Sequence, residues 1–105
     1  MNKMDTKSPL FQELLTIIFK VREKITDSSD VIWAGYDSPV QLRNELDFLA
    51  EQLQQGNEEA LVELHGRFLP TGVFQELSIS NGWDDEYLRL AEQFDKIYSQ
   101  FKNNP

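Results

Sequence analysis

The chain has 105 residues, 40% of them hydrophobic, and its 18 acidic and 10 basic side chains give a net charge of −8. This size and composition predict one folded domain and exclude intrinsic disorder, because such a chain can bury a hydrophobic core without disulfides or metals. The absence of cysteine and the presence of a single histidine exclude thiolate chemistry and leave zinc without its usual ligands.

The negative charge is concentrated in the middle of the chain. Residues 27–66 carry nine acidic groups against a single basic one, Arg43, whereas residues 1–26 have a net charge of +2. Because clusters of Lys and Arg bind phosphates and anionic lipids, we expect neither direct nucleic-acid binding nor membrane docking. Charged residues interrupt every apolar run well short of the ~20 residues that cross a bilayer, so we expect a soluble, cytoplasmic protein.

The first two predicted helices begin with the same signal. At Ser8-Pro9 and at Ser38-Pro39, serine is expected to cap the helix and proline to take its first position. Apolar residues recur at helical spacing from Leu10, and "TDSSD" ends the first helix. The second helix carries leucines 42, 46, 49 and 53 on one face and ends at Gly56.

Three further helical segments are expected in the second half of the chain. Asn57 caps a helix that Pro70 closes, and a shorter segment begins at Thr71 and ends at Ser80-Asn81-Gly82. Asp84 is expected to cap the last helix. A stripe of residues at helical spacing follows that cap: Tyr87, Ala91, Phe94, Tyr98 and Phe101.

These signals predict an all-α fold: one helical domain over residues 1–105, built as a small bundle of four main helices and one short helix. We expect the ends, residues 1–7 and 103–105, to be frayed. The longest connection, a loop rich in aromatic and acidic residues, lies between the first and second helices. The only strand candidate, residues 30–36, is short and has no obvious partner strand.

No pattern predicts a catalytic, metal or cofactor site. His65 lies near the apolar stripe of its helix, where we expect a partly buried side chain bonded to a backbone group or a carboxylate. Gly66 beside it suggests close packing or a break in the helix. The acidic stretches "DSSD" and "WDDEY" lack the alternating ligands, central glycine and distal glutamate of a calcium loop.

Two predicted loops combine aromatic residues with carboxylates. Aromatic side chains supply contact area in interfaces, and acidic groups steer a basic partner into place. Each tryptophan also has a structural interpretation: Trp33, with Val31 and Ile32, as a lid on the core, and Trp83 as a staple against Leu88. The candidate partner-binding residues are Asp27, Asp30, Trp33, Tyr36 and Asp37 in the first loop and Trp83, Asp84, Asp85 and Glu86 in the second.

The favoured hypothesis is a small acidic binding protein without catalytic activity that engages a basic protein partner. An inhibitor of the immunity or antitoxin kind, which covers a cationic nucleic-acid-cleaving site, fits this pattern best. The first alternative is a helical adaptor or a self-associating subunit that dimerises through the tyrosine-rich face of the last helix. A more distant alternative is a carboxylate-dependent hydrolase that uses a divalent cation.

Overall fold

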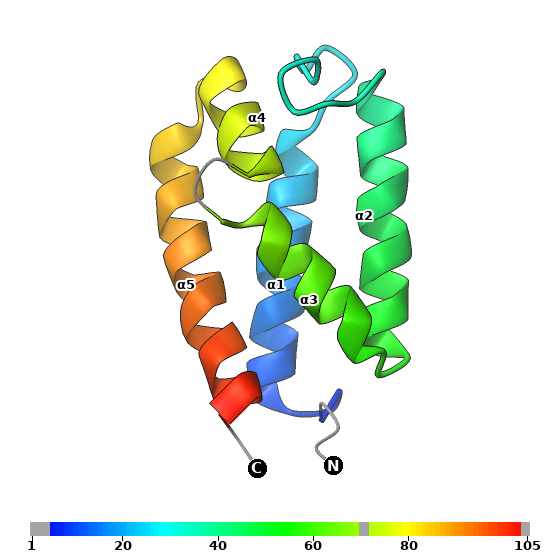
Figure 1. The fold of residues 1–105 in the computed structure, drawn as a ribbon, viewed down its shortest axis with the longest axis vertical. Coiled ribbons are helices and arrows are strands. Elements are labelled where there is room, and N and C mark those ends of the chain that lie inside the picture. The colour runs from blue at the N-terminus through cyan, green and yellow to red at the C-terminus, as the bar shows by residue number, and fades with distance from the viewer. Residues whose placement is uncertain (1–4, 70–71, 104–105) are drawn as a thin grey trace.

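The structure, a computed structural model, describes residues 5–69 and 72–103, and every regular element in these residues is an α-helix. The five helices confirm the predicted all-α fold and its division into four main helices and one short one (Figure 1). They are α1 (Pro9–Lys24), α2 (Pro39–Gln54), α3 (Glu58–Arg67), α4 (Val73–Asn81) and α5 (Asp84–Asn103).

Three of the predicted N-caps are confirmed. The Ser8 hydroxyl accepts a hydrogen bond from the Phe11 amide at 3.1 Å, and Ser38 accepts one from Gln41 at the same distance. The Asn57 side chain caps α3 by accepting from the Glu59 amide at 3.0 Å. Each cap satisfies a backbone N–H that has no partner within its own helix.

The cap of α5 differs from the prediction. The helix begins at Asp84 itself, and the carbonyl of Trp83 accepts the first helical hydrogen bond, from the Tyr87 amide at 2.9 Å. Trp83 therefore takes the cap position that the sequence analysis gave to Asp84. The acids at 84, 85 and 86 form the first turn, where negative charge suits the helix dipole.

The predicted boundaries near residues 70–71 and at the chain ends are tested only in part. Pro70 and Thr71, the expected stop and start, lie outside the described residues, as do residues 1–4 and 104–105. The Ser8 amide donates to the Asp5 carbonyl at 3.1 Å, so a hydrogen-bonded turn precedes α1. At the other end α5 extends to Asn103.

Side chains from all five helices meet in one core. α1 packs against α2 and α5, while α3 contacts α2, α4 and α5 (Figure 1). Phe68, which follows α3, stacks on Phe94 with ring centroids 4.2 Å apart and meets Phe74 edge-on at 4.9 Å. Offset and edge-on contacts of this kind add to the stability gained by burial of the rings. No helix in the described residues is long and apolar enough to span a membrane.

Three of the connections between helices lie at the ends of the bundle. The α1–α2 loop and the α4–α5 turn lie at one end, and the α2–α3 turn lies at the other end near both termini (Figure 1). The two predicted aromatic-acidic loops therefore share one end of the molecule.

Candidate functional site

The tip of the α1–α2 loop exposes two adjacent large apolar side chains. Ile32 is 76% exposed and Trp33 is 74% exposed, whereas Val31 beside them is buried in the core. The predicted inward-folding lid is therefore confirmed for Val31 and wrong for Ile32 and Trp33. We name residues 31–36 the tip.

Backbone hydrogen bonds hold the tip in a tight turn. The Tyr36 amide donates to the Val31 carbonyl at 3.1 Å, and the Gly35 amide donates to the Ile32 carbonyl at 3.0 Å. This nested pair is the Schellman pattern that closes helix ends, and it needs a left-handed residue at the position of Gly35. Gly35 supplies it with a φ of 89°, which glycine adopts without steric cost.

The side chain of Asn81, at the end of α4, ties the loop to the rest of the bundle. Its Oδ1 accepts from the Asp30 amide, and its Nδ2 donates to the carbonyls of Asp30 and Leu77, all at 2.8 Å. Asp30 in turn accepts from the Ile32 amide at 3.2 Å. These contacts show that the α1–α2 loop and the end of α4 lie side by side.

Arg43 of α2 holds the start of the same loop. Its Nη1 donates to the Ile25 carbonyl at 3.1 Å, and its Nη2 donates to Asp27 Oδ1 at 2.6 Å. The candidate residue Asp27 is therefore already paired with a cation within the chain, although its side chain is exposed.

Tyr36 anchors the other side of the tip. Its hydroxyl donates to the Glu45 carboxylate of α2, which also accepts from Arg67 Nη2 at 2.8 Å. Burial raises the pKa of Tyr36, and the hydrogen bond to Glu45 raises it further. Burial pushes the pKa of Glu45 upward, but hydrogen bonds from Arg67 and Tyr36 outweigh it and lower that pKa. Tyr36 thus serves as a half-buried support for the loop.

In the second candidate loop, the tryptophan is buried rather than exposed. Trp83 is 9% exposed and meets Tyr87 edge-on with ring centroids 6.3 Å apart, while Leu88 lies on the surface. The predicted staple against Leu88 is wrong, and Trp83 is not available as a surface anchor. Its indole N–H is buried with no hydrogen-bond partner in the described residues, so the ring acts here through packing.

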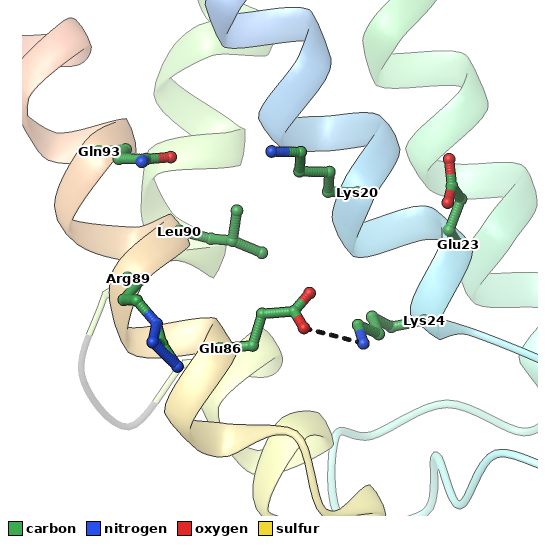
Figure 2. Close-up of a pocket in the computed structure, with 7 residues that line it drawn as sticks. All are labelled: Lys20, Glu23, Lys24, Glu86, Arg89, Leu90 and Gln93. Carbon is green, nitrogen blue, oxygen red and sulfur yellow. Dashed lines mark ion pairs between the residues drawn. The ribbon is translucent and has the colours of Figure 1, made fainter.

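The three acids at the start of α5 separate into two groups. Asp84 and Asp85 are exposed, whereas Glu86 is half-buried and forms an ion pair with Lys24 of α1 at 3.0 Å. Figure 2 shows this pair in a groove of about 450 Å³ between α1 and α5. Because the cations Lys20 and Arg89 also line the groove, Glu86 belongs to a mixed-charge surface, and we remove it from the candidate binding set.

The residues expected to be structural behave largely as predicted. His65 is half-buried, its Nε2 lies 3.5 Å from Asp95 Oδ1, and its ring stacks on Tyr98 at 3.8 Å. Gly66 is not a site of close packing, because a Cβ at this position would meet no atom within 4 Å. Within the described residues, no group of three or more His, Cys, Asp or Glu side chains is placed to hold a metal ion.

The supports of the loop were missed by the sequence analysis. Asn81 was read only as part of a helix stop, and Arg43, Glu45 and Arg67 were read only as charges. The partners through which they support the loop lie between 9 and 51 residues away in the chain, so no local pattern could indicate the contacts. Comparison with protein-family models, with curated proteins and with solved structures found no match for this chain.

Proposed function

We propose that this protein is a small acidic binding protein that docks on a basic protein partner through the tip of the α1–α2 loop. It acts as a non-catalytic inhibitor of the immunity or antitoxin kind, and it covers a cationic nucleic-acid-cleaving site on the partner. The observation that carries the proposal is the exposure of Ile32 and Trp33 on a loop held by Arg43, Asn81 and Glu45.

The hydrogen bonds that hold the loop in place support a binding role. Ordering a flexible segment at an interface costs free energy, and a loop that is already fixed avoids most of that cost. A tryptophan presented in this way offers a large, stiff contact surface, and tryptophan is enriched among the residues that dominate binding energy. Adjacent exposed apolar side chains on a rigid turn are also costly in water when they have no partner.

The charges around the tip support a basic partner. Asp30 and Asp37 flank it in the same loop, and Asp84 and Asp85 are exposed at the same end of the bundle. Surface acids of this kind steer a cationic protein into place and raise its association rate, whereas a buried aromatic anchor slows dissociation. In this proposal the four aspartates act mainly on association and Trp33 acts mainly on dissociation.

A capture experiment with matched variants tests the proposal. Tagged wild-type protein is incubated with lysate of the source organism, washed at low and then high salt, and the retained proteins are identified by mass. We expect a basic protein that binds the wild type, releases with salt, and dissociates at least about tenfold faster from Trp33→Ala, since truncation of a hot-spot residue costs 2 kcal/mol or more. The purified partner should also lose nuclease activity when the wild type is added.

The matched control removes equal charge from the other end of the molecule. Asp30→Asn/Asp37→Asn should slow association at low salt, whereas Glu58→Gln/Glu59→Gln, next to the α2–α3 turn, should leave it nearly unchanged. Association that is independent of salt, or a captured protein that binds Trp33→Ala as well as wild type, would contradict the proposal. So would retention of no basic protein.

The two alternatives from the sequence analysis receive less support. Tyr87 of α5 is buried and Tyr98 stacks on His65, so the tyrosine-rich face of this helix is turned largely into the bundle. For the hydrolase, the groove between α1 and α5 contains Glu23 and Glu86, and the latter is paired with Lys24. Neither arrangement favours these functions over binding at the tip.

A further inference from the structure

We propose that the side chain of Asn81 acts as a latch, which means that it fastens the α1–α2 loop to the end of α4, and that deamidation of this side chain releases the loop. The loosening of the loop follows from the contacts of Asn81 alone. Its consequence for partner binding rests on the function proposed above.

The latch depends on an amide, because Asn81 uses both of its polar atoms. Nδ2 donates to the carbonyls of Asp30 and Leu77, and Oδ1 accepts from the Asp30 amide. An ionised carboxylate accepts hydrogen bonds but donates none. Conversion to aspartate would keep the acceptor, lose both donated bonds, and place a negative oxygen against two carbonyl oxygens.

The residue after Asn81 makes that conversion chemically accessible. The backbone nitrogen of Gly82 can attack the side-chain carbonyl carbon of Asn81, and the new C–N bond closes a five-membered succinimide ring as ammonia leaves. Water then opens the ring to aspartate or isoaspartate, which loses a proton at neutral pH. Glycine carries no Cβ to hinder the attacking nitrogen, and asparagine is among the residues that are unstable to heat.

The folded structure opposes the first step. The Gly82 amide is engaged with the Ser78 carbonyl, at a Gly82 φ of 80°. The side-chain nitrogen Nδ2 of Asn81 donates hydrogen bonds to the carbonyls of Asp30 and Leu77. Cyclisation therefore requires the end of α4 to open first. The rate of deamidation at Asn81 should report how often the latch opens, and a partner bound at the tip should slow it.

The first test compares Asn81→Asp with Asn57→Asp. Both substitutions convert one asparagine to a carboxylate, but Asn57 is the cap of α3, where aspartate is an equally good cap. Hydrogen exchange of residues 26–37 is measured in each full-length variant. We expect exchange of the tip amides at least about tenfold faster in Asn81→Asp, because the hydrogen bond donated to the Asp30 carbonyl is lost and a negative oxygen takes its place there. Asn57→Asp should keep wild-type exchange.

The second test follows the chemistry in the wild-type chain. Isoaspartate at residue 81 is quantified by peptide mapping during incubation in buffer and in urea. We expect deamidation at least about tenfold slower in the folded protein, since it must wait for local opening. Equal rates in buffer and urea would overturn the protection by the latch. Unchanged loop exchange in Asn81→Asp would overturn the latch itself, whatever the outcome of the partner capture.

Discussion

Tyr87 shows how one residue connects two elements of this bundle. It lies on α5, is almost fully buried, and donates its hydroxyl to the Phe68 carbonyl at 2.9 Å, directly after α3. That carbonyl is among the last of α3, where helix carbonyls have no partner within the helix. The hydrogen bond therefore closes the end of one helix with a side chain from another.

The Tyr87 hydroxyl should make the free energy of unfolding decrease at alkaline pH. Burial raises the pKa of Tyr87 from 10 to about 12, so the folded state favours the neutral phenol. The contribution of Tyr87 to stability should be constant below pH 10 and fall as pH rises from 10 to 12, because the unfolded chain ionises first. Tyr87→Phe should lower the free energy of unfolding at pH 7 by about 1–3 kcal/mol, since it removes the buried hydrogen bond to the Phe68 carbonyl, and should flatten the alkaline decline.

Urea unfolding followed by circular dichroism at pH 7 to 11.5 checks this prediction. Tyr36, whose pKa is also raised, should leave part of the decline in the variant. A Tyr87→Phe variant with the same alkaline decline as wild type would show that another group controls it.

At the scale of the elements, local chemistry explains where most helices begin. Ser8, Ser38 and Asn57 cap their helices with their own side chains, as the sequence predicts. The exception is α5. The sequence predicted Asp84 as the cap, which would start the helix at residue 85, but the helix starts at Asp84 itself. Asp84 serves the helix equally well as a first-turn acid, so the local pattern could not distinguish the two positions.

Gly66 of α3 offers a test of helix propensity. It has no positive φ, and an added Cβ would meet no atom within 4 Å. Gly66→Ala should therefore raise the free energy of unfolding by about 0.5 kcal/mol, because alanine loses less backbone entropy in a helix. Gly35→Ala is the matched variant with the opposite expected sign. Its Cβ also meets no atom within 4 Å, but alanine at a φ of 89° should lower the free energy of unfolding by about 1 kcal/mol. Urea midpoints of both variants check the signs, and stabilisation by Gly35→Ala would contradict the structure of the tip.

At the scale of the whole molecule, the exposed aromatic side chain and four exposed aspartates share one end. Asp30, Asp37, Asp84 and Asp85 lie with Trp33 at the end that holds the α1–α2 loop, while the groove between α1 and α5 carries charges of both signs. A net charge of −8 makes copies of the chain repel one another. The tip is thus suited to a partner of opposite charge.

We expect the protein to be monomeric at micromolar concentration. The α5 tyrosines that suggested a dimer face largely inward, and the other exposed large apolar side chains include Phe19, Phe48 and Leu88 on three different helices. Sedimentation over a concentration series should give the mass of one chain throughout. A mass that rises toward two chains would contradict this, and its loss in Trp33→Ala would place the contact at the tip.

The sequence by itself determined the helices, three of their caps, the acidic character and the two segments that hold the candidate residues, since these depend on composition and on contacts within a few residues. Tertiary structure alone decided which aromatics face water. Trp33 is exposed while Trp83 is buried, and Tyr36 and Glu86 are engaged with Glu45 and Lys24. It also decided that Asn81 joins the α1–α2 loop to the end of α4. The reason is physical: burial and pairing depend on residues up to 51 positions apart, and only the packed helices bring them together.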